Sequence, residues 1–153
     1  MTMAKFYEIV PIKYSEVHIL FYEAMMLNNI PITHTGNSVE DNIRVESFLL
    51  HARNLIDFLE GKGHLKCSQF KDNDNNKIVP IKFSSDDTMR RINEHLSHIS
   101  TGRKTIKINW KLKLLKNEIN EKLKNFLSKI SDGYFPSPEG ISKESFIISL
   151  SST

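Results

Sequence analysis

Apolar residues recur every three or four positions in four stretches of the chain, and this spacing predicts four amphipathic helices. The predicted helices cover residues 14–29, 39–60, 86–99 and 104–130. The broadest apolar stripe belongs to the second helix and consists of Val45, Phe48, Leu49, Ala52, Leu55, Ile56 and Leu59. Helices with one apolar face must bury these faces against one another, and an antiparallel four-helix bundle achieves this with few elements. The pattern therefore predicts an all-α fold.

Turn-forming and polar residues indicate where the helices begin and end. Pro31 ends the first helix, because the residue before a proline avoids the α conformation. Ser38, with Asp41 three residues later, predicts a capping box at the start of the second helix. Gly61 is expected to end the second helix and Gly102 the third.

Two segments lie outside this periodic pattern. The connection of residues 62–85 is long, and its centre, residues 71–77, predicts a turn or flexible loop. Residues 78–83 are expected to be extended and packed on the bundle. Residues 1–131 are predicted to form one helical domain and residues 132–153 a C-terminal tail. That tail is expected either to be mobile or to dock on the body or on a second subunit.

Composition places the chain among ordinary globular proteins. The 153 residues are 39% hydrophobic and 25% charged, which suits a single helical domain without metal or disulfide crosslinks. Cys67 is the only cysteine, so it forms no internal disulfide, and this favours a reducing compartment. Charged residues interrupt the N-terminal stretch, which predicts neither a secretion signal nor a membrane span. We therefore expect a cytoplasmic protein without a membrane partner.

Positive charge gathers in the C-terminal part of the chain. Residues 103–129 contain nine lysines and arginines and two acidic residues, although the net charge is only +3. This asymmetry predicts RNA or another anionic partner. The alternative is that the lysines merely solvate an exposed helix face. The residues expected to contact nucleic acid are Arg103, Lys104, Lys107 and Lys111.

Most common enzyme motifs are absent. The chain has no glycine-rich phosphate loop, no paired-cysteine metal site, no nucleophile elbow and no His-Glu-x-x-His helix. We predict no cofactor and no metal, although two histidines with Asp57 leave a metal site as a minor alternative.

One flank of the third predicted helix carries candidate catalytic residues. At about 100° per residue, Arg91, His95 and His98 fall on the same flank. Histidine exchanges protons near neutral pH, and arginine binds phosphate through two parallel hydrogen bonds. Cleavage of RNA without a metal needs a base, an acid and a cation. These three residues are therefore the predicted catalytic set.

The second predicted helix carries Arg53 and Asp57 on one polar flank. If this flank meets that of the third helix across a groove, the two residues are expected to orient the histidines. The alternative is that they pair with each other, four residues apart, on a solvated helix face.

Two stretches, ESFLLHARNLIDFL (46–59) and INEHLSHISTGR (92–103), resemble uncharacterised bacterial helical proteins and the HEPN superfamily of four-helix bundles. The HEPN signature is an arginine followed, after four to six residues, by a histidine. Arg90 with His95 and Arg91 with His98 both match this spacing. A polar residue often follows the arginine, but Ile92 follows Arg91 here, and an Arg-Asn pair occurs instead at Arg53 and Asn54.

The resemblance implies either a metal-independent RNase of a toxin or defence system or an inactive relative, with the site expected at a homodimer interface. A different class also fits the sequence, namely a non-enzymatic helical interaction or dimerisation module. A third alternative is non-specific nucleic-acid binding by the lysine-rich fourth helix, with an affinity that falls steeply with salt.

Overall fold

The computed structural model describes residues 15–33, 35–83, 86–97, 111–135 and 141–151. Over these residues the chain is all-α, as predicted, with five α-helices and no β-strand. The helices are α2 (Ser15–Asn29), α3 (Ser38–Leu59), α4 (Asp86–Ser97), α6 (Leu112–Lys129) and α7 (Lys143–Ser149). The predicted helix starting at residue 104 is described only from residue 111 onward, and there α6 begins at Leu112.

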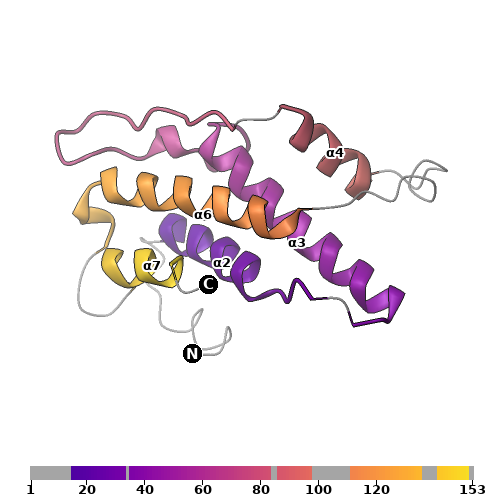
Figure 1. The fold of residues 1–153 in the computed structure, drawn as a ribbon. Coiled ribbons are helices and arrows are strands. Elements are labelled where there is room, and N and C mark those ends of the chain that lie inside the picture. Colours follow the sequence, from indigo (N-terminus) through magenta and orange to yellow (C-terminus); the bar gives the residue numbers. More distant parts are fainter. Residues whose placement is uncertain (1–14, 34, 84–85, 98–110, 136–140, 152–153) are drawn as a thin grey trace.

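Helix α3 is the central element, and α2, α4 and α6 all pack against it (Figure 1). Its predicted stripe is buried as expected, except that Val45 is only partly buried. The opposing helices contribute Val17, Leu20, Ala24 and Leu27 from α2, Ile92 from α4, and Ile119, Leu123, Phe126 and Leu127 from α6. Burial of these apolar faces is the main force that holds the helices together.

The start of α3 differs from the predicted capping box by one residue. Asn37 is the N-cap, and its side-chain oxygen accepts hydrogen bonds from the backbone N–H groups of Val39 (3.0 Å) and Glu40 (3.2 Å). Asp41 instead accepts bonds from the N–H and the hydroxyl of Thr35, each at 2.9 Å. The cap therefore lies one residue before the predicted Ser38.

The long connection after α3 is anchored to the bundle at several points. Gly61 ends α3 with a φ of +76°, and a Cβ on it would lie only 2.8 Å from the side chain of Pro80. Phe70 packs edge-to-face against Phe58 and Phe126. Residues 78–83 pack against the helices, since both Ile78 and Phe83 are buried. The described part of this connection is therefore held against the helices.

The C-terminal helix α7 docks on the body of the protein. Phe146 is fully buried and meets Phe21 of α2 edge-to-face at a centroid distance of 4.9 Å. Lys143 donates to the backbone oxygen of Ile130 at 2.6 Å, which satisfies a carbonyl at the end of α6. The C-terminal tail was expected either to be mobile or to dock on the body or on a second subunit, and its residues 141–151 dock on the body. None of the helices in the described ranges is long and apolar enough to cross a membrane.

Candidate functional site

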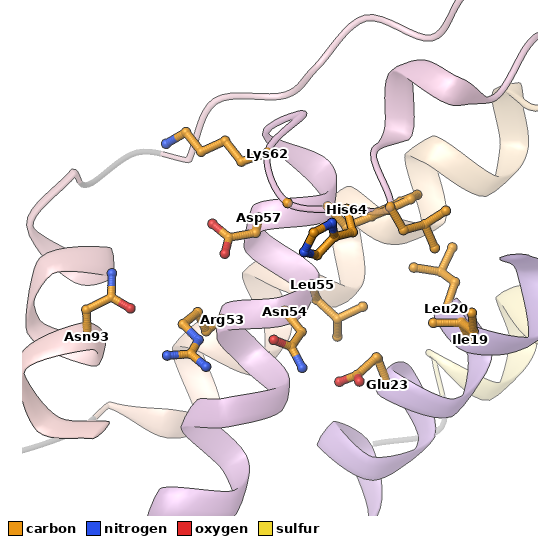
Figure 2. Close-up of a pocket in the computed structure, with 13 residues that line it drawn as sticks. Ile19, Leu20, Glu23, Arg53, Asn54, Leu55, Asp57, Lys62, His64 and Asn93 are labelled. Atoms are coloured by element: carbon orange, nitrogen blue, oxygen red, sulfur yellow. The ribbon is translucent and has the colours of Figure 1, made fainter. Parts of the chain in front are cut away.

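An open groove of about 440 Å³ runs over the exposed face of α3, between α2 and α4 (Figure 2). Its lining comes from α2, α3, α4 and the loop that follows α3. The lining residues are Ile19, Leu20, Glu23, Arg53, Asn54, Leu55, Asp57, Phe58, Lys62, Gly63, His64, Leu65 and Asn93. This volume is in the range of small-molecule sites.

The positions of the polar groups follow from local structure. Arg53, Asn54 and Asp57 lie on the side of α3 that faces away from its buried stripe. Gly63 has a φ of +82°, a left-handed conformation that turns the chain back so that His64 reaches the groove. Asn93 follows the fully buried Ile92, so the docking of α4 through Ile92 brings Asn93 to the groove.

The side of the groove that faces α4 is charged. Arg53 and Asp57 both project toward Asn93 (Figure 2). Burial raises the pKa of Asp57, although the positive charges of Lys62 and Arg53 oppose this rise. Lys62 also pairs with Glu60 at 3.3 Å. This side of the groove thus combines the positive groups of Arg53 and Lys62 with the Asp57 carboxyl.

The side that faces α2 combines polar groups with an aliphatic wall. Glu23 points toward Asn54, and His64 lies above them (Figure 2). Glu23 Oε2 lies 2.6 Å from Nδ1 of His51, a buried residue of α3. The ring of His51 also meets Tyr22 edge-to-face at 5.9 Å. This contact holds the Glu23 carboxylate in one place at the groove.

Five polar side chains of the groove are left without a partner. Within the described parts of the chain, no hydrogen bond or ion pair engages the side chains of Arg53, Asn54, Asp57, His64 and Asn93. Arg53 and Asp57 form no direct ion pair, and their charges interact only at longer range. Together these groups offer a ligand a guanidinium fork, two amides, an imidazole and a carboxyl.

The predicted catalytic flank lies on the other edge of α4. Arg91 and His95 are half-buried, each with a contact of its own, and neither is among the residues that line the groove. Arg91 and Asn93 are about 200° apart around the helix, on either side of the buried Ile92. The structure thus brings Arg53 and Asp57 to Asn93, and not to Arg91 and His95. Burial lowers the pKa of His95.

Other predicted residues fall in different places. His98, Arg103, Lys104 and Lys107 lie outside the described residues. Lys111 is exposed at the start of α6. Arg90, the alternative HEPN arginine, is exposed and pairs with Asp87 and Glu94, which hold the pKa of its guanidinium above the ordinary value.

Sequence reasoning missed Glu23, Lys62, His64 and Asn93. The one available signal for Glu23 was an acidic residue within the apolar run LFYEAMML of the first helix. Lys62 and His64 reach the groove only through the turn after α3. No local pattern marks them.

Comparisons with protein-family models, with curated proteins and with solved structures find no match for this chain. Within the described ranges, no group of three or more His, Cys, Asp or Glu side chains is arranged to hold a metal ion.

Proposed function

We propose that the protein is a HEPN-like helical protein that binds RNA in the groove over α3. The observation that carries this proposal is the Arg53 guanidinium, which lines the groove without an acidic partner at bonding distance. A free guanidinium fork matches two oxygens of a phosphate group. Lys62 adds positive charge, and the amides of Asn54 and Asn93 supply donors and acceptors for sugar or base.

The binding test compares the half-buried Arg53 with the exposed Arg90, because the two arginines differ in their partners. Arg53 lines the groove, whereas Arg90 is already held by Asp87 and Glu94. Each change to alanine removes one positive charge. Fluorescence anisotropy with labelled single-stranded RNA should show that Arg53→Ala weakens binding by about 10- to 100-fold. Arg90→Ala should change it little.

Two results would contradict this function. Equal losses in the two variants would indicate binding by overall charge and not by the groove. Failure of the wild-type protein to bind RNA even at low salt, where phosphate contacts are strongest, would exclude RNA as the ligand.

RNA cleavage without a metal is a separate part of the proposal. Its predicted residues are Arg91 and His95, which lie on the α4 edge away from the groove, and His98, which lies outside the described residues. The lowered pKa of His95 favours a neutral imidazole near pH 7, which is the form that accepts a proton. Total RNA incubated with the protein in EDTA should be cleaved by wild type and not by His95→Ala or His98→Ala. Binding without cleavage would identify an inactive relative of the nucleases.

A second candidate function is a homodimerisation module, and one specific observation favours it. Val39, Ile43 and Leu50 are exposed by 65%, 61% and 40%, and their spacing places them on one face of α3. This stripe leads along α3 toward Arg53, so a second copy seated on it would lie beside the groove. Apolar stripes that remain exposed on a monomer commonly mark contact surfaces.

Light scattering over a range of protein concentrations tests this candidate. We expect a dimer that Ile43→Lys converts to a monomer. Leu114→Lys is the matched control, because Leu114 of α6 is 63% exposed outside the stripe. A strictly monomeric wild-type protein would rule out self-association.

A further inference from the structure

The α2 side of the groove has the features of a base-recognition site. Leu20 and Leu65 form an aliphatic wall there with Ile19, which is 52% exposed. A flat ring laid against this wall would remove apolar surface from water. The polar edge of the ring would then meet Glu23 and Asn54, which face each other across this part of the groove (Figure 2).

Glu23 is an acceptor that is held in place before any ligand binds. Its side chain is only 18% exposed, and His51, whose side chain is 8% exposed, engages its Oε2 atom. Oε1 has no partner within the described residues, and Oε2 has a second lone pair besides the one that faces His51, so the carboxylate can accept two ligand donors. An ionised carboxylate only accepts hydrogen bonds, so a ligand at this position must present N–H or O–H donors.

Asn54 complements this acceptor with a donor. Its amide is exposed and unbonded, so it can donate one hydrogen bond without breaking a contact of the fold. A base that fits both residues therefore carries N–H donors next to a carbonyl oxygen. Guanine has this edge, because its N1–H and its exocyclic amine are adjacent donors and O6 is the neighbouring acceptor. Adenine and cytosine present one amine beside a ring-nitrogen acceptor, and uracil presents one N–H between two carbonyl oxygens. Each therefore gives the carboxylate a single donor group, whereas guanine gives it two adjacent ones.

We propose that the α2 side of the groove is a base subsite that selects guanine, in a free nucleotide or in single-stranded RNA. Arg53 and Lys62 hold the phosphate on the α4 side of the groove. The ribose crosses α3 between the phosphate and the base. Asp57 and Asn93 form hydrogen bonds with the ribose hydroxyls in this arrangement. This inference rests on the proposed RNA-binding function and adds the identity of the base.

The experiment measures binding of four labelled single-stranded RNAs that are identical except for one central nucleotide in an otherwise uridine sequence. Competition by free GMP, AMP, CMP and UMP distinguishes a free nucleotide from a base within RNA. We expect the guanosine RNA to bind about tenfold more tightly than the others. GMP should be the strongest competitor.

Two variants test the residues that are assigned to the base. Asn54→Ala removes an exposed side chain without bonds in the fold, so it should abolish the guanine preference without lowering Tm. Glu23→Gln should also abolish it, because the amide presents a donor where guanine presents one. Lys62→Ala is the matched control, and it should weaken all four RNAs by the same factor and leave the preference intact.

The outcomes separate this inference from the function on which it rests. Equal binding of the four RNAs would overturn the guanine subsite and leave RNA binding standing. A guanine preference that survives both Asn54→Ala and Glu23→Gln would also overturn it. Binding of none of the RNAs and none of the nucleotides would overturn the proposed function, and the subsite would fail with it.

Discussion

Truncation of Ile92 to alanine should release α4 from α3 and disable the groove. Ile92 is fully buried and is the anchor by which α4 packs on the central helix. The change removes three carbon atoms, which costs about 2.4 kcal/mol at about 0.8 kcal/mol for each buried carbon. The cavity that remains raises the total loss to about 3 kcal/mol.

This loss should be concentrated in α4, because α3 is the helix against which α4 mainly packs. Native-state hydrogen exchange of the α4 amides should become about 100-fold faster, as expected for a local opening that is easier by about 3 kcal/mol. Asn93 would lose its place at the groove, so RNA affinity should fall in parallel. Leu114→Ala, at an exposed site of α6, is the control and should cost less than about 0.5 kcal/mol.

Two results would refute this reasoning. Unchanged exchange of the α4 amides would mean that Ile92 does not hold the helix. Acceleration by the same factor in α2, α3 and α6 would mean that α4 unfolds only together with the whole domain.

Three further predictions concern polar groups. Burial raises the pKa of Asp57, so ionisation of this carboxyl destabilises the fold as the pH rises above 3.8, its ordinary value. Asp57→Asn should therefore raise Tm at pH 7. An unchanged Tm would refute burial as the cause. Burial lowers the pKa of His95, so stability should fall as pH drops through 6.5, and His95→Gln should reduce that loss in urea titrations above and below this pH. Asn28 and Asn120 exchange two hydrogen bonds, at 3.0 and 2.7 Å, between α2 and α6. Asn120→Leu alone should therefore cost about 2 kcal/mol in the free energy of unfolding, and the double change to leucine should recover most of it. A double variant that is no more stable than the single one would contradict this account.

The helices were predictable because their signal is local. Every buried side chain of α3 except His51 and Phe58 belongs to the predicted stripe, and the predicted ends of that helix are each within one residue of the observed ones. His51 is the informative exception, since its burial depends on Glu23 of another helix. A histidine between leucine and alanine carries no sign of a partner 28 residues away.

Only the part of the groove that comes from α3 was predictable, because the sequence signal is local. Arg53 and Asp57 were recognisable as a polar flank on the second helix, but their partner on α4 was expected to be the edge with Arg91 and His95. Packing through Ile92 presents Asn93 instead. The choice between the two edges depends on how α4 packs on α3.

Apolar periodicity and turn residues are properties of neighbouring positions, so the amino-acid order alone establishes that this chain forms amphipathic helices and which of their faces are apolar. It also establishes the basic C-terminal stretch and the polar flank of Arg53 and Asp57. The meeting of that flank with Glu23, His64 and Asn93 is decided only in the tertiary structure. Glu23 and Asn93 come from helices far apart along the chain from this flank, and His64 comes from the turn at Gly61 and Gly63, so the geometry of the groove follows from the packing of whole helices and from that turn.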